Sequence, residues 1–163
     1  MNEKAKELLG KAKYDFADLC RVMEILRGEG GCPWDREQTH ESIRKNFIEE
    51  TYEVVEAIDT KDAHLLCEEL GDVLLQVVFH TQREAGRFTI DDVTDGIVKK
   101  LIYRHPHIFA DTTAETAETV LDNWDKLKAK EKHRDTVTAS MRSVPRPLPA
   151  LMRAEKVGKR AAK

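Results

Sequence analysis

The sequence predicts an all-α fold, a bundle of about five helices. Aromatic residues make up only 6% of the chain and charged residues 35%, a balance typical of helical proteins. Seven of the 13 glycines and prolines lie in two short stretches, residues 28–33 and 145–149, which leaves long segments with few helix breakers. No segment alternates apolar and polar residues as a half-buried strand does, so a sheet is not expected.

Two helices are predicted before residue 60. The first carries apolar side chains at helical spacing and ends at the glycines that follow it: Phe16, Leu19, Met23 and Leu26, then Gly28, Gly30 and Gly31. The segment Cys32-Pro33-Trp34-Asp35 is interpreted as a turn. The second helix extends to about Asp59, and its apolar stripe is Ile43, Phe47, Ile48, Tyr52, Val55 and Ile58.

Three more helices follow. Asp62 can cap the third, which ends at Gly86 and has the most continuous apolar face of the chain: Leu66, Leu70, Val73, Leu74, Val77 and Val78. Thr89 and Asp92 resemble a capping box for a fourth helix, which His105-Pro106 ends. A fifth is marked by Ala117, Val120, Leu121, Trp124 and Leu127.

A chain of 163 residues is long enough for one core and too short for two. We therefore expect one domain at residues 1–134. A loop with prolines at every second position follows at residues 135–149. Residues 150–163 restart a helix, which is interpreted as a terminal helix or as the beginning of a linker to a second domain.

Charge and cysteine content exclude several classes of partner. The net charge of -3 and the pI of about 6.1 create no overall field for nucleic acid, which is not expected as a partner. Cys20, Cys32 and Cys67 lack the spacing of a zinc ribbon or a disulfide scaffold, which favours a reducing cytoplasm. The uncharged stretch at residues 73–82 is too short to cross a bilayer, so membrane insertion is not expected.

Acidic residues on two neighbouring helices form the main candidate site. The second predicted helix carries Glu49, Glu50 and Glu53, and the third carries Glu69 and Asp72. Residues three or four apart on a helix have Cβ atoms about 5–6 Å apart, so the members of each set share a face.

The third predicted helix should hold its acids beside the core. With Leu70 at the centre of the apolar face, Glu69 falls about 100° away and Asp72 about 160° away. If this helix packs antiparallel to the second through a turn at residues 60–61, the acidic margins converge on one site. Carboxylate oxygens without cysteine suit Mg²⁺, with Mn²⁺ as a substitute.

Two other interpretations of these acids exist. Glutamate is a good helix former, and runs of it also occur on ordinary solvated faces. A di-iron bundle needs two Glu-x-x-His helices, but the sequence has this pattern once, at residues 37–40, so that site is set aside.

Short segments beside the acids carry a family resemblance. They are Gly31-Cys32-Pro33-Trp34-Asp35 with Gln38-Thr39, Glu69-Leu70-Gly71-Asp72, and Arg104-His105-Pro106-His107-Ile108-Phe109-Ala110-Asp111. Together with Glu-Glu-x-x-Glu at residues 49–53, they resemble the MazG family of the all-α nucleoside triphosphate pyrophosphohydrolase superfamily. The resemblance extends from about Leu19 to residues 148–152.

This resemblance implies Mg²⁺-dependent hydrolysis of nucleoside triphosphates to nucleoside monophosphate and pyrophosphate. It implies four metal ligands: Glu50, Glu53, Glu69 and Asp72. Glu49 is then the neighbouring carboxylate that positions or deprotonates the attacking water. The family fold is a helical bundle whose core is completed by a second subunit.

The resemblance also implies nucleotide contacts on the fourth and fifth helices. Lys100 and Arg104 match a basic pair that contacts the triphosphate and stabilises the transition state. Trp124 and Lys128 match a pair near the nucleotide. Plainer explanations exist, because cations suit the end of a helix dipole and Trp124 lies on an apolar stripe.

Two other functions remain open. MazG proteins often carry two such domains in tandem, so an N-terminal copy that binds nucleotide or holds a dimer together, with little activity of its own, is an alternative. A pure dimerisation module is a third possibility. The apolar faces of the second and third helices exceed what one short chain covers, which predicts a homo-oligomer, a dimer in the first place.

Overall fold

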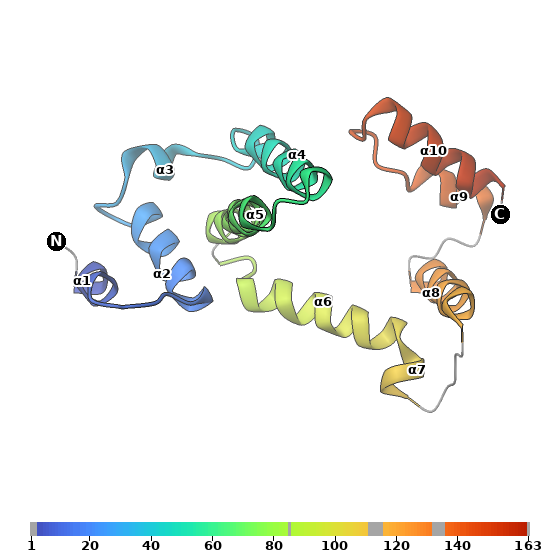
Figure 1. The fold of residues 1–163 in the computed structure, drawn as a ribbon, viewed down its shortest axis with the longest axis horizontal. Helices are drawn as coiled ribbons and strands as arrows, with labels where there is room; N and C mark the ends of the chain where they lie inside the picture. Colours follow the sequence, from blue (N-terminus) through green and yellow to red (C-terminus); the bar gives the residue numbers. More distant parts are fainter. Residues whose placement is uncertain (1–2, 85, 111–115, 132–135, 163) are drawn as a thin grey trace. The chain divides into compact units, whose positions relative to one another are not determined.

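The described part of the chain is helical, without strands, in agreement with the predicted all-α class (Figure 1). The structure is a computed structural model that describes residues 3–84, 86–110, 116–131 and 136–162. The chain divides into two compact units, residues 1–94 and 95–163. No helix in the described ranges is long and apolar enough to cross a membrane.

The first unit is organised around a helical hairpin. Its helices are α1 (Glu3–Leu9), α2 (Phe16–Arg27), α3 (Pro33–Glu37), α4 (Arg44–Thr60), α5 (Ala63–Arg83) and the first turns of α6 (Ile90–Arg104). The helices α4 and α5 pack along one another, and α2 packs on α5 (Figure 1). The predicted second and third helices, and the hairpin that they form, are confirmed.

Two residues make the turn between α4 and α5. Lys61 has φ 58° and ψ 31°, a left-handed conformation that ends α4. The Asp62 carboxylate accepts hydrogen bonds from the backbone N–H groups of His64 and Leu65, at 2.9 and 3.0 Å. Asp62 therefore caps α5 as predicted, and the two helices reverse direction without a longer loop.

The core of the first unit joins α2, the start of α4 and the second half of α5. It consists of Met23, Ile43, Val78 and Phe79, with Leu19, Cys20, Leu26 and Leu75 packed against it. The predicted apolar face of α5 is thus only partly internal: Val78 is fully buried, whereas Leu70 is 50% exposed. The core therefore uses the C-terminal part of the predicted stripe, at Val78, together with Phe79 and Leu75 beside it.

The second unit contains the rest of α6 and the helices α7 (Pro106–Phe109), α8 (Ala117–Glu131), α9 (Val137–Arg142) and α10 (Ala150–Ala161). Thr89 and Asp92 form the predicted capping box at the start of α6. The Thr89 N–H donates to the Asp92 carboxylate, and the Asp92 N–H donates to the Thr89 hydroxyl. The helical restart at Ala150 is confirmed as α10, which packs against α9.

Four short helices were not predicted, α1, α3, α7 and α9, and two of them replace segments that were interpreted as turn or loop. Residues 33–37, taken as part of a turn, form α3, because Pro33 occupies the first helical turn, where its missing N–H costs nothing. Residues 137–142, taken as loop, form α9, whose first turn is capped by the Thr136 hydroxyl. Both helices are too short to show an apolar period.

A histidine pair ties the segment before α4 to the end of α5. His40 Nδ1 lies 2.7 Å from His80 Nδ1, and His40 Nε2 lies 2.7 Å from Glu84 Oε1. One of the two facing nitrogens must accept, so the contact is lost when both rings are fully protonated. Burial lowers the pKa of His80, and the hydrogen bond with His40 lowers the pKa of Glu84.

This cluster should make the chain less stable in acid. His80 and Glu84 each have a lower pKa in the folded chain than in the unfolded chain. Their contribution to the free energy of unfolding is therefore complete above the unfolded pKa and is lost as the pH falls. The loss should begin near pH ~6.5 for His80 and continue below pH ~4.3 for Glu84.

Urea unfolding of the wild type and of His40→Ala at several pH values measures this effect. We expect the difference in free energy of unfolding between the two to shrink toward acid. His64→Ala, an exposed histidine in the first turn of α5, is the control and should show no such trend. A difference for His40→Ala that stays constant between neutral pH and acid would contradict the role of the cluster.

Candidate metal centre

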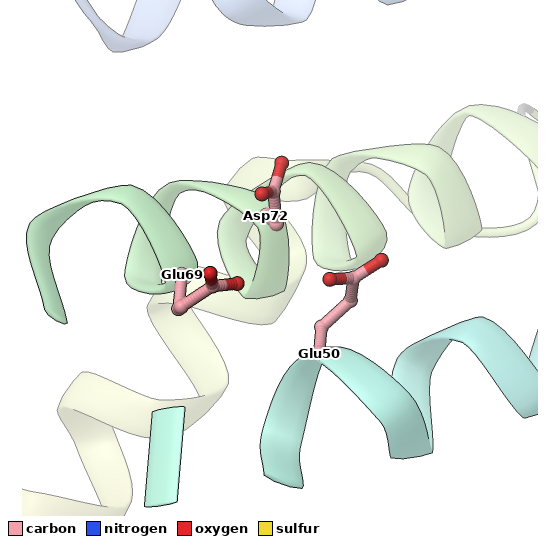
Figure 2. Close-up of side chains that lie close together, drawn as sticks. All are labelled: Glu50, Glu69 and Asp72. Carbon is pink, nitrogen blue, oxygen red and sulfur yellow. The ribbon is translucent and has the colours of Figure 1, made fainter. Parts of the chain in front are cut away.

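The α4–α5 hairpin brings three carboxylates together. One oxygen each from Glu50, Glu69 and Asp72 lies within 4.8 Å of the other two. Figure 2 shows the Glu50 side chain extending from α4 toward α5, where Glu69 and Asp72 stand about one helical turn apart. The sequence placed these residues at the margins of the two helices, and the hairpin makes those margins face one another.

The cluster is partly withdrawn from water and carries like charges. Glu69 is 9% exposed, and Glu50 and Asp72 are half-buried. Burial raises the pKa of Glu50, and its hydrogen bond with Glu53 and the charge of Asp72 raise it further. Burial also raises the pKa of Glu69, together with the charges of Glu53 and Asp72.

Such an arrangement fits a divalent cation. Without a cation or an added proton, close carboxylates in a site of reduced solvation repel one another. The cluster presents oxygen donors alone, the ligand type that hard divalent metals prefer. Burial and the neighbouring carboxylates raise the pKa values of Glu50 and Glu69, and the charge of a bound metal would act in the opposite direction.

Two further predicted acids lie beside the cluster. Glu53 is exposed, yet its carboxyl contributes hydrogen bonds that raise the pKa of both Glu50 and Glu69, so it sits at their rim. Glu49 is outside the group of three. It pairs with Lys45, whose Nζ lies 2.7 Å from Glu49 Oε1, and its side chain is 50% exposed.

The predicted nucleotide contacts lie in the second unit, where Arg104 is 5% exposed. Its Nε and Nη2 donate to Glu131 Oε2 at 2.9 and 2.7 Å. The guanidinium carbon lies 5.2 Å from the centroid of the Trp124 ring, and the His105 ring meets the same indole edge-on at 4.9 Å. Arg104 and Trp124 are thus brought together.

The two predicted lysines of this unit are half-buried. Lys100, on α6, lines a cavity of about 610 Å³. Lys128 lies on α8, one turn beyond Trp124. Sequence reasoning missed Glu131, the partner of Arg104, because a carboxylate at the end of a lysine-rich helix has no distinguishing spacing. All three cysteines are free, as expected from their spacing.

The comparison with protein families covers the acidic cluster. Residues 38–109 match the model described as the MazG nucleotide pyrophosphohydrolase domain. This span includes all of α4 and α5, and with them Glu49, Glu50, Glu53, Glu69 and Asp72.

Three curated relatives extend the comparison. The nucleoside triphosphate pyrophosphohydrolase of Escherichia coli strain K12 is 47% identical over 147 residues, which is 88% of this chain and 56% of that protein. The nucleoside triphosphate pyrophosphohydrolase/pyrophosphatase MazG of Thermotoga maritima is 52% identical over 119 residues, 72% of this chain and 45% of that protein. The uncharacterized protein YabN of Bacillus subtilis is 47% identical over 148 residues, 90% of this chain and 30% of that protein.

The chain thus spans about half or less of the length of these relatives. The family model and the names of the relatives agree with one another, and on these grounds the chain belongs to the MazG family, with the family's domain at residues 38–109.

Proposed function

We propose that this chain hydrolyses nucleoside triphosphates to nucleoside monophosphate and pyrophosphate with the help of Mg²⁺, for which Mn²⁺ can substitute. The observation that carries this proposal is the cluster of Glu50, Glu69 and Asp72, with oxygens within 4.8 Å of one another. The names of the relatives from Escherichia coli and Thermotoga maritima support the reaction. The proposed metal ligands are Glu50, Glu53, Glu69 and Asp72.

The proposed reaction is attack of water on the α-phosphorus. The water oxygen forms a bond to phosphorus, the bond from phosphorus to the bridging oxygen breaks, and pyrophosphate leaves with that oxygen. When bound, Mg²⁺ supplies Lewis-acid stabilisation of the phosphate charge. Glu49 positions the water and accepts its proton. The exposure of this side chain leaves one face open to water.

The second unit supplies the proposed substrate contacts. Lys100 and Arg104 bind the triphosphate and stabilise the charge that develops in the transition state. Trp124 offers an indole face to the base, with Lys128 one turn further along α8. The contact between Arg104 and the Trp124 ring supports a joint role, because it holds a phosphate-binding group beside a base-binding one.

A second candidate function follows from the length of the relatives. The activity in their names belongs to proteins of which this chain spans 56% or 45%. In this alternative the chain is a copy that binds nucleotide or holds a dimer together, while another part of a longer protein performs most of the hydrolysis. The cluster of Glu50, Glu69 and Asp72 favours a metal-dependent role over a purely structural one, because close carboxylates cost stability that a structural module has no need to lose.

Product analysis tests the reaction. Incubated with nucleoside triphosphates and Mg²⁺, the chain should release monophosphate and pyrophosphate, which chromatography separates from diphosphate and orthophosphate. Activity should vanish in EDTA and return with Mg²⁺ or Mn²⁺. Release of diphosphate would refute attack at the α-phosphorus, and full activity in chelator would refute the metal.

Amide substitutions test the metal ligands. Glu69→Gln and Asp72→Asn should each lower turnover at least ~100-fold, since each removes a charged ligand oxygen, and they should leave the helical circular-dichroism signal unchanged. Asp59→Asn is the matched control. It makes the same change on α4, nine residues and therefore ~180° from Glu50, and should keep normal turnover. Near-normal turnover in either ligand variant would remove that residue from the site.

We also propose that two copies of the chain form a dimer through the outer face of the hairpin. Large apolar side chains remain exposed on α4 and α5 in the first unit: Ile48 at 53%, Tyr52 at 54%, Val55 at 45%, Ile58 at 55% and Leu70 at 50%. Apolar patches of this kind are rarely left in water by a soluble monomer. A two-fold partner covers them with the same face of its own hairpin.

Light scattering at micromolar concentration tests the dimer. The wild type should have twice the 18.6 kDa mass of one chain. Leu70→Lys should lose the dimer through unfolding or aggregation, because a charge is buried in an interface that should exceed ~2,000 Å². Leu151→Lys places the same charge on α10, where the side chain is 86% exposed, and should stay dimeric. A folded, monodisperse monomer of the wild type would contradict the shared interface.

A further inference from the structure

Glu131 takes part in two features of the second unit, an ion pair and the lining of a cavity. It accepts both hydrogen bonds that Arg104 donates, and it forms part of the wall of a cavity of about 610 Å³. The remaining lining comes from one face of α6 and from the end of α8: Gly96, Lys99, Lys100, Tyr103 and Lys130.

The cavity is suited to a polyanion. Three lysines line it, and Lys100 and Lys130 have no ion-pair partner among the residues that the structure describes, while Lys99 pairs with Asp95 at 2.6 Å. Among the residues that the structure describes, Glu131 is the one carboxylate of the lining. The cavity is open to solvent rather than enclosed, so an extended anion can enter it from the surface.

The pairing of Arg104 resembles the way in which a guanidinium holds phosphate. Both Nε and Nη2 point at a single oxygen of Glu131, and the group is 5% exposed. These are the donors that arginine directs at carboxylate and phosphate oxygens alike. A phosphate that reached Arg104 would therefore have to take the place of the Glu131 carboxylate.

We propose that Glu131 is an internal competitor for the phosphate chain of the ligand. An incoming polyphosphate enters the lysine-lined cavity, displaces Glu131 and takes over its hydrogen bonds from Arg104. The displacement is favourable for an anion that also reaches the lysines, because the repulsion between its charge and Glu131 drives the carboxylate outward. That this ligand is a nucleoside triphosphate rests on the proposed function; the competition itself does not.

The competing explanation is that Glu131 only ties the end of α8 to α6. The two roles predict opposite changes in the affinity for an anion when the charge of Glu131 is removed. Removing the charge of a competitor strengthens the binding of the anion, whereas removing a structural tie loosens the cavity and weakens it. Glu131→Gln separates them, because the amide keeps the size of the side chain and an acceptor oxygen while losing the charge.

The test is calorimetric titration of the full chain with inorganic tripolyphosphate. EDTA in the buffer keeps metal ions from contributing at the acidic cluster. We expect Glu131→Gln to bind at least several-fold more tightly than the wild type, and Lys130→Gln to bind several-fold more weakly. Glu118→Gln is the matched control, with the same charge change on the same helix about 20 Å away along its axis, and it should bind as the wild type does.

A double variant locates the competition at Arg104. In an Arg104→Gln background, the further change Glu131→Gln should bring no tightening, because there is no guanidinium left to release. Unchanged or weaker binding in Glu131→Gln, tightening that persists without Arg104, or absence of tripolyphosphate binding in every variant would each overturn the proposal.

Hydrolysis assays on the same variants separate this proposal from the proposed function. Tighter tripolyphosphate binding in Glu131→Gln without any hydrolysis of nucleoside triphosphates leaves the competition standing and refutes the enzyme. Hydrolysis by the wild type without tightening in Glu131→Gln refutes the competition alone.

Discussion

The packing of α4 against α5 is the contact on which the acidic cluster depends. Glu50 belongs to one helix and Glu69 and Asp72 to the other, so the three meet only because the hairpin holds the helices in one register. Ala57, 0% exposed, lets the helices approach closely where a larger side chain would separate them. The left-handed Lys61 and the cap at Asp62 reverse the chain within two residues, which leaves little freedom for sliding.

Electrostatics oppose this packing, and the core has to offset it. Bringing Glu69 to 9% exposure beside other acids costs free energy, as its raised pKa shows. Val78 and Phe79, on the same helix, bury apolar surface against Met23 and hold α5 in place. The apolar packing near the C-terminal end of α5 thus offsets the unfavourable electrostatics of the acidic cluster nearer the N-terminal end of the same helix.

The long helices could be predicted from the sequence because each has an apolar stripe. The helical spacing of the apolar residues in such a stripe is visible over three or more turns. The carboxylate cluster could be predicted in outline, since Glu69 and Asp72 stand one turn apart on such a stripe's margin. Short α3 and α9 could not, because caps and a proline specify them rather than period. The pairing of Arg104 with Glu131 was also beyond reach: 27 residues separate them, and only the tertiary fold brings the two charges together.

The single continuous helix that carries both Val78 and Glu69 has a consequence for how the family can change in length. One residue inserted between them would turn the acids by about 100° and shift them about 1.5 Å relative to the buried valine. Either the acids or the apolar side chains would then face the wrong neighbour. Insertions and deletions should therefore be tolerated in the loop that follows α2 but not between Glu69 and Val78 in α5, although neither the acidic cluster nor a core residue would itself be altered.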